Sequence, residues 1–239
     1  MTHQPLYIAD NIFLCLTEDY CVILDLRADN YLCMERKNMT ALGPWLEGWP
    51  SSTQGSPPAF MPDELASFTA KLLEAGILTR DNRQSRSAAP TAVYPSTDVY
   101  KELGSGTARP SLLDWYRFAL AAHSAHVALK RGRLEDTVRS VSNRRNLSDD
   151  NLTDPGSTDE LSVLVAKFNT MRQAFPRRYL CLYDSLALVN FLSRFNFFPQ
   201  WVFGVRSNPF MAHCWVQSGS VVLNDTLDQV CSYTPIMKV

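Results

Sequence analysis

Three side chains near the C-terminus have the types that nucleophilic catalysis requires. Cys181 begins the stretch CLYDSLALVN, His213 lies in FMAHCWVQ, and Asp225 closes VVLND. A cysteine nucleophile needs a general base that accepts its proton, and the base needs a partner that fixes its orientation. The order Cys, His, Asp fits this arrangement, so we predict that the three residues form a catalytic triad.

Cys181 is predicted at the start of a helix. Apolar residues recur behind it at helical spacing: Leu182, Leu186, Val189 and Leu192. Backbone N–H groups at a helix N-terminus, together with the guanidinium groups of Arg177 and Arg178, would favour the nucleophilic thiolate. A lone cysteine is more often a buried core residue than a reactive one. The position of Cys181 therefore does not assign its role by itself.

His213 and Asp225 are predicted on neighbouring strands. The apolar run 200–205 is typical of a strand buried on both faces, and two further runs flank the sequence SGS, which indicates a hairpin. A three-residue loop would place His213 opposite Asp225, whereas a two-residue loop would place it opposite Asn224. Either partner could fix the histidine tautomer. Strand alternation puts Cys214 on the other face from His213, so we expect Cys214 in the core.

Two helices are predicted ahead of Cys181. The first, 111–130, is expected to bury one side that carries Leu112, Tyr116, Leu120 and Val127. The second follows a capping box made by Ser157 and Glu160. Its apolar residues recur at helical spacing: Leu161, Leu164, Val165, Phe168 and Met171. The polar sequence 144–157 between the two helices is predicted to be a loop.

The first 81 residues read as a small separate domain. Its predicted elements are strands at 12–17, 21–26 and 30–34, a short helix at 39–46, an amphipathic helix at 63–75 and a short strand at 77–81. Cys15, Cys21 and Cys33 fall inside the strands, where a free thiol behaves as a small hydrophobic group. The composition of residues 82–92 cannot bury enough apolar area to order itself. We therefore predict a linker at 82–105 and a second domain at 106–239.

Composition excludes several classes of function. The net charge of −1 gives no electrostatic support for binding nucleic acid. The first twenty residues contain acidic side chains and no basic start with an apolar run, so we expect a cytoplasmic protein with no membrane association. The six cysteines should then be reduced. Their spacing, and that of the histidines, matches no metal site, and we expect neither a metal nor a cofactor.

The C-terminal motifs resemble a known family. The shared pieces are Cys-Leu-x-x-Ser-Leu-Ala-Leu, Gly-Val-Arg-x-x-Pro-Phe, Ala-His-x-Trp-Val and a closing Asn-Asp, in that order. This run resembles the C-terminal domain of the lasso-peptide leader peptidases, the maturation B proteins, which are transglutaminase-like cysteine peptidases. The resemblance implies that Cys181 is the nucleophile, His213 the general base and Asp225 the orienting acid.

The same resemblance gives an expected fold. It is α+β, with an N-terminal winged helix-turn-helix domain similar to PqqD, followed by a transglutaminase-like, papain-like peptidase domain. The N-terminal domain would bind the leader of a lasso precursor peptide as an added strand beside 30–35, leaning on the helix 63–75. The residues expected to contact the leader are Tyr31, Leu32, Cys33, Met34, Phe68, Lys71 and Leu72. A second implied partner is an asparagine-synthetase-like lasso cyclase.

The sequence leaves two other functions open. The same triad could transfer an acyl group to an amine, as transglutaminase-like folds also allow. Alternatively, the chain could deliver the precursor to the cyclase without catalysing a reaction. The favoured prediction is hydrolysis of one peptide bond at the junction between leader and core.

Overall fold

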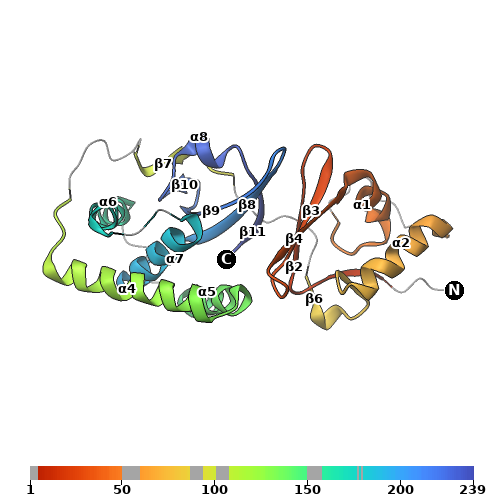
Figure 1. Cartoon of the computed structure of the whole chain (residues 1–239), viewed down its shortest axis with the longest axis horizontal. Coiled ribbons are helices and arrows are strands. Elements are labelled where there is room, and N and C mark those ends of the chain that lie inside the picture. The colour runs from red at the N-terminus through yellow and green to blue at the C-terminus, as the bar shows by residue number, and fades with distance from the viewer. Residues whose placement is uncertain are drawn as a thin grey trace. The chain divides into compact units, whose positions relative to one another are not determined.

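The computed structural model describes residues 5–49, 60–86, 94–100, 108–149, 158–176, 178 and 180–239. The chain is a mixture of helices and sheets, and it divides into two compact units (Figure 1). The first unit comprises Met1–Thr91, Val205–Phe210 and Thr234–Met237. The second comprises Ala92–Gly204, Met211–Tyr233 and Lys238–Val239.

The N-terminal strands form two small antiparallel sheets. The first has the order β2-β3-β4 and consists of Ile12–Leu16, Tyr20–Asp25 and Asn30–Glu35. These strands confirm the three that the sequence predicts. The second has the order β5-β1-β6 and consists of Leu78–Thr79, Tyr7–Ala9 and Ser85–Arg86. The strands β1 and β6 were not predicted, since two or three residues carry too little pattern to show alternation.

Helices complete this unit and close its core. They are α1 (Arg36–Leu42), the 3-10 helix η1 (Gly43–Trp45) and α2 (Asp63–Glu74). Helix α2 stops at Gly76, whose φ of 69° favours glycine. The core includes Cys21 and Leu72, while Cys15 is also buried. The expectation that Cys33 would be buried as well is wrong, because it lies on β4, an edge strand that is exposed on both faces.

Part of the predicted linker is structured. Asn82–Gln84 forms the 3-10 helix η2, and β6 follows it directly. Farther along, β7 (Thr97–Asp98) pairs with a strand of the second unit. The expectation that 82–92 would not order itself is therefore wrong at 82–86, and the linker predicted over 82–105 contains a short strand at Thr97–Asp98, because neighbouring strands satisfy the backbone groups of these residues. The remaining boundary residues lie partly outside the described chain, and the domain limits stay a prediction.

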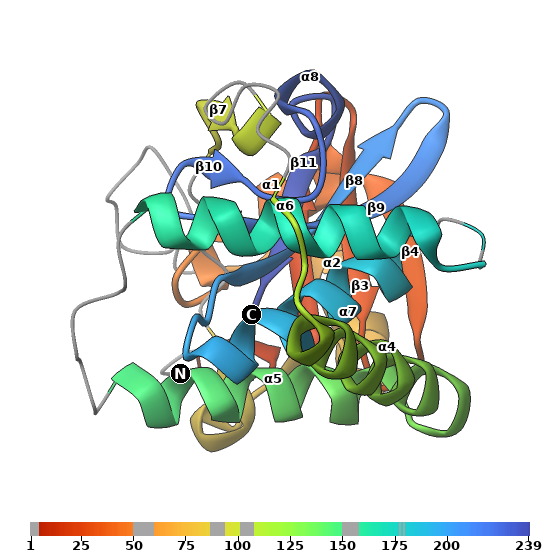
Figure 2. The ribbon, with the colours of Figure 1, turned by 90° about the vertical axis from the view of Figure 1, so that its left-hand side faces the viewer.

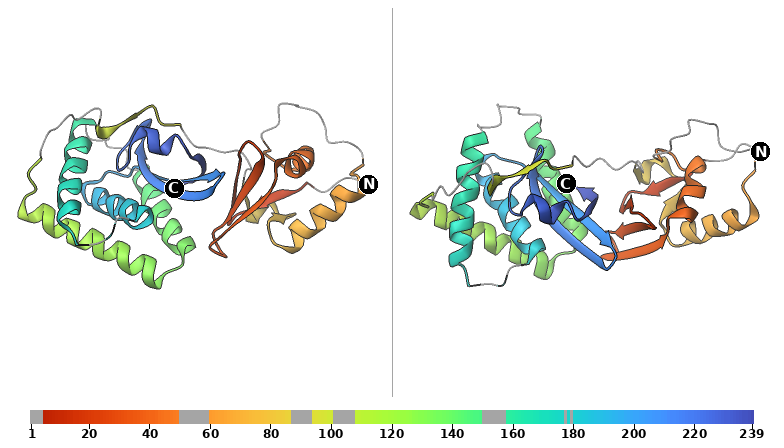
Figure 3. Two further views of the ribbon diagram at one scale, coloured as in Figure 1. Left: turned by 45° about the horizontal axis from the view of Figure 1, so that its top comes forward. Right: turned by 90° about the horizontal axis from the view of Figure 1, so that it is seen from above.

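The C-terminal strands form one five-stranded sheet. Its order is β11-β8-β9-β10-β7, with bounds Thr234–Lys238, Gln200–Ser207, Phe210–Ser218, Val221–Val222 and Thr97–Asp98. The hairpin β9-β10 is antiparallel, and β7 joins β10 in parallel. Figure 3 shows the long strands β8 and β9, coloured blue, from two directions. The buried strand predicted at 200–205 is confirmed as the inner part of β8.

Five helices whose bounds lie in the described part of the chain accompany this sheet. They are α4 (Leu112–Arg131), α5 (Leu134–Asp149), α6 (Thr158–Ala174), α7 (Cys181–Leu192) and α8 (Leu227–Val230), and the 3-10 helix η3 (Ser193–Phe195) extends α7. Helix α5 was missed, and its last turn corrects the loop predicted at 144–157. Its polar composition gives no apolar periodicity from which a helix could be predicted. Contacts with other elements hold it in place, such as the 2.9 Å hydrogen bond from Arg144 Nη2 to Asn190 Oδ1 on α7. Ser157 of the predicted capping box lies outside the described residues.

Helix α4 buries a different face from the predicted one. Leu112 and Tyr116 are 90% and 60% exposed, respectively. The buried residues are Asp114, Phe118, Ala121, Ala122 and Ala125. Small alanines let α4 pack closely on α7, where the Tyr183 hydroxyl donates to the Ala122 carbonyl at 3.1 Å. The prediction counted large apolar residues and overlooked this face.

Helix α7 is the centre of the second unit. All its residues from Tyr183 to Leu192 are buried. Helices α4 and α6 contact it (Figure 2), and an aromatic chain runs from Phe118 through Phe168 to Phe191 with centroid distances of 5.5 and 5.6 Å. Ser185 joins its inner face to β9. This packing fixes the axis of the helix whose first residue is Cys181.

Candidate active site

The first residue of α7 is Cys181, and its thiol is exposed. Two buried charges hold the helix start in place. The Asp184 carboxylate accepts hydrogen bonds from Arg172 Nε and, at 2.7 Å, from the Leu180 N–H. Arg172 also donates to the Arg178 carbonyl at 3.0 Å. The segment leading into Cys181 is thereby tied to α6 and α7, and the Cys181 N–H is one of the helix-start donors without an intrahelical acceptor.

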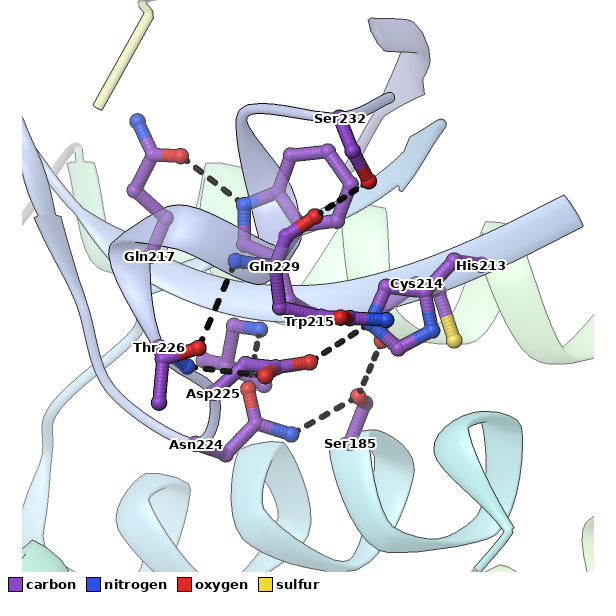
Figure 4. A network of polar contacts seen from close by, with 11 residues as sticks. Ser185, His213, Cys214, Trp215, Gln217, Asn224, Asp225, Thr226, Gln229 and Ser232 are labelled. Atoms are coloured by element: carbon purple, nitrogen blue, oxygen red, sulfur yellow. Dashed lines mark hydrogen bonds and ion pairs between the residues drawn. The ribbon is translucent and has the colours of Figure 1, made fainter. Parts of the chain in front are cut away.

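His213 on β9 is oriented by Asp225. The imidazole Nε2 and the Asp225 Oδ2 are 2.6 Å apart, and the other carboxylate oxygen accepts the Thr226 N–H at 2.8 Å. The His213 ring lies 5.0 Å from the Tyr233 ring and 6.1 Å from that of Trp215. Its side chain is 14% exposed and that of Asp225 is 22% exposed. The pair is therefore partly shielded from water, with Nδ1 as the ring nitrogen left for another partner (Figure 4).

The hairpin register differs from both predicted registers. Ser218 pairs with Val221, so the two-residue loop consists of Gly219 and Ser220 rather than beginning at Ser218. Gly219 has a φ of 56°, which is the conformation that glycine permits in such a turn. Strand β10 ends at Val222, and Asp225 lies beyond it. His213 therefore meets Asp225 through the segment after β10, not through a cross-strand pair.

The Cys181 thiol is strongly acidic. Its pKa is lowered to about 4, mainly because the Cys214 side chain and then the His213 side chain form hydrogen bonds with the thiolate. Partial burial of the thiol opposes this shift, and the Cys214 backbone N–H adds to it. The predicted guanidinium contribution is not among these causes, and Arg177 lies outside the described residues. The thiolate is stabilised mainly by β9 residues.

His213 has the complementary shift. Burial alone would lower its pKa, but the hydrogen bond to Asp225, the interaction with Cys181 and the negative charge of both raise it to about 9. Between about pH 4 and pH 9 the two groups therefore exist as a thiolate and an imidazolium. Because each charge stabilises the other, the two titrations belong to the pair. Such a pair supplies a charged nucleophile and a proton donor before any substrate arrives.

Cys214 is a site residue that sequence reasoning missed. It is buried, as predicted, with a thiol pKa raised well above the usual value by burial and by Cys181. Its thiol nevertheless interacts with Cys181, Trp201 and Ser185. Strand alternation placed Cys214 on the opposite face of β9 from His213. It gave no indication that Cys181, at the start of α7, would contact Cys214. The tripeptide His213-Cys214-Trp215 contains no pattern that would indicate this contact.

The predicted leader-binding residues lie on two elements of the first unit. Tyr31, Leu32, Cys33 and Met34 belong to β4, where Leu32 is 38% exposed and Met34 packs partly on the core. On α2, Lys71 is exposed, Phe68 packs partly against the core, and Leu72 is only 5% exposed. Leu72 thus supports the domain from inside. Tyr31, Leu32, Cys33 and Met34 lie along an edge strand, while Phe68 and Lys71 lie on helix α2.

Comparison with known proteins identifies the C-terminal part. Residues 120–238 match the family model of the transglutaminase-like superfamily. These residues form a transglutaminase-like domain. It contains Cys181, His213 and Asp225, and proteins of this superfamily are typically cysteine-based enzymes. The comparisons with curated proteins and with solved structures gave no match.

Two features are absent from the described residues. No helix among them is long and apolar enough to cross a bilayer. Within the same residues, no cluster of three or more histidine, cysteine or acidic side chains is arranged to hold a metal ion.

Proposed function

We propose that the protein is a cysteine peptidase of lasso-peptide biosynthesis, which binds the leader of a precursor peptide and hydrolyses the bond at the leader–core junction. The observation that carries the proposal is the exposed, acidic Cys181 beside a His213 that Asp225 orients at 2.6 Å. The transglutaminase-like match over 120–238 supports cysteine-based chemistry, and the shared motifs from Cys181 to Asp225 support the leader-peptidase reading.

The proposed reaction has two steps. The Cys181 thiolate attacks the scissile carbonyl, whose oxygen gains the negative charge, and the Cys181 N–H is placed to stabilise it. His213 then gives its proton to the leaving amine, which releases the core peptide and leaves the leader as a thioester on Cys181. In the second step His213 takes a proton from water, the hydroxide attacks the thioester, and the thiolate is regenerated. Asp225 holds the imidazole through both steps.

Leader capture is assigned to the first unit. Strand β4 is at the edge of its sheet, and most of its residues are exposed, so its outer backbone groups suit pairing with an added peptide strand. Lys71 lies exposed on α2, where it could meet an acidic leader residue. A lasso cyclase would act on the released core. Tethering the leader raises the effective concentration of the cleavage site near Cys181.

Mass spectrometry of a precursor peptide incubated with the protein tests this function. A free leader and a free core are the expected products, and Cys181→Ala should abolish them while leader affinity stays unchanged. The loss should be a thousandfold or more, on the order expected for a triad nucleophile. Unaltered processing by Cys181→Ala would remove the thiol from the chemistry and favour a delivery role.

Acyl transfer to an amine is the second candidate, and the superfamily match is what favours it. The first step would be the same, and an amine would replace water as the attacking group. Incubation with a primary amine distinguishes the two, because transfer adds the mass of the amine to the leader fragment. The hydrolase proposal predicts an unmodified leader C-terminus.

A further inference from the structure

Where the backbone hydrogen bonds between β9 and β10 end, a side-chain oxygen takes the place of a backbone acceptor. The last ladder bond runs from the Leu223 N–H to the Val216 carbonyl at 2.9 Å. The Val216 N–H then donates to Asn224 Oδ1 at 2.7 Å. Because the side-chain amide takes the place of a backbone acceptor, the main chain can turn away from β9 after Leu223. That turn brings Asp225, the residue after Asn224, within hydrogen-bond distance of His213.

The other end of the same amide reaches α7. Asn224 Nδ2 donates to Ser185 Oγ at 2.9 Å, and the Ser185 hydroxyl donates to the Cys214 carbonyl at 3.1 Å. Figure 4 shows Ser185 below β9 with both bonds. Ser185 is fully buried, so water does not compete for these bonds. The helix, the strand and the segment after β10 thus meet in one polar contact.

Each member of this contact is next to a member of the proposed triad. Ser185 lies one helical turn after Cys181 and on the same face of α7. Cys214 follows His213 along β9, and Asn224 precedes Asp225. Displacing any one of the three would therefore displace the catalytic group beside it.

We propose that Ser185 and Asn224 are positioning residues, which hold α7, β9 and the Asp225 segment at the spacing that the Cys181–His213 contact requires. This inference rests on the proposed catalytic role of the triad and adds two residues to its machinery. Buried polar groups cost free energy unless they are paired, and an apolar pair could fill the same space. Their value here is geometric, since catalytic groups must be held to within a fraction of an ångström.

The test measures the Cys181 thiol itself. The rate of Cys181 alkylation by iodoacetamide is followed against pH by peptide mass spectrometry, in the full chain and in the variants Ser185→Ala and Asn224→Ala. Each variant should raise the alkylation midpoint by about one pH unit, the order of one weakened hydrogen bond. The double variant should raise it little further, because the two residues form one bridge.

Matched controls lie at the far end of α7 and in η3, which extends it. Ser193→Ala removes a hydroxyl that bonds to the Asn190 carbonyl at 3.0 Å, and Asn190→Ala removes a buried amide that binds Arg144. Both should reduce stability without moving the midpoint. If precursor cleavage is observed, Ser185→Ala and Asn224→Ala should lower kcat with little change in KM, since leader capture is assigned elsewhere.

Folded Ser185→Ala and Asn224→Ala proteins with the wild-type midpoint would overturn the inference. So would equal shifts in the Ser193→Ala and Asn190→Ala controls, because a general loss of stability would then explain the effect. Should Ser185→Ala not fold, Ser185→Cys keeps a weak hydrogen-bonding group and provides the same comparison. A shifted midpoint in a protein that cleaves no precursor would contradict the proposed function and leave this inference standing.

Discussion

The buried pair of Arg172 and Asp184 offers the sharpest test of how the nucleophile is held. Both side chains are almost fully buried, at 2% and 5% exposed. Arg172→Met would keep most of the apolar bulk and would leave the Asp184 carboxylate with the hydrogen bond from the Leu180 N–H. It would also free the Arg178 carbonyl, which accepts from Arg172 Nη2.

Leaving one buried charge unpaired costs about 3–5 kcal/mol, whereas replacing both partners by apolar residues is often neutral. We therefore expect Arg172→Met to lower the free energy of unfolding by that amount, and Arg172→Met with Asp184→Leu to recover part of it. For a chain of this size the single variant should lose roughly 6–20 °C in Tm. Circular dichroism during heating measures the loss.

Stability and reactivity should separate in the double variant. Its helix start lacks the bonds to Leu180 and Arg178, so Cys181 alkylation should stay slower than in the wild type even if Tm recovers. Exposed Arg139, which pairs with Glu135 at 3.0 Å on α5, provides a control: Arg139→Met should cost less than about 1 kcal/mol. A loss of that small size from Arg172→Met, with wild-type alkylation, would refute the reasoning.

Three further predictions follow from the site and the edge strand. Cys214→Ala should raise the pKa of Cys181 above about 4, because the largest stabilising contact of the thiolate is removed; the pH dependence of alkylation measures it. The rate of peptide cleavage should fall below about pH 4, where the Cys181 thiolate is protonated, and above about pH 9, where His213 loses its proton. Asp225→Asn should move the alkaline limb of this pH profile to lower pH, because Asp225 raises the pKa of His213, and should reduce kcat about a hundredfold or more. Leu32→Lys on the exposed edge strand should raise KM for the full precursor with kcat unchanged, and an unchanged KM would contradict leader binding at β4.

The sequence predicted those features that depend on local periodicity. The helix behind Cys181 and the three N-terminal strands follow from spacing that any packed environment preserves. The types and order of Cys181, His213 and Asp225 likewise predicted a triad, because a cysteine at a helix start, a histidine on a strand and an acid after the next strand supply a nucleophile, a base and an orienting group.

The predictions that were wrong concern features that depend on contacts between distant segments. The buried face of α4 is decided by how closely alanines approach α7, which large apolar residues on the other side concealed. The β9-β10 register depends on Gly219 in the turn and on Asn224, whose amide ends the ladder early. Neither the role of Asn224 nor the contact of Cys214 with Cys181 has a signature in local sequence.

The central claim is that Cys181 exists as a thiolate paired with the His213 imidazolium. The pH dependence of Cys181 alkylation in the wild-type protein tests it most directly. The account predicts a midpoint near pH 4 that rises when His213 is replaced by alanine. A midpoint near 9, the value of an ordinary thiol, in both proteins would contradict it.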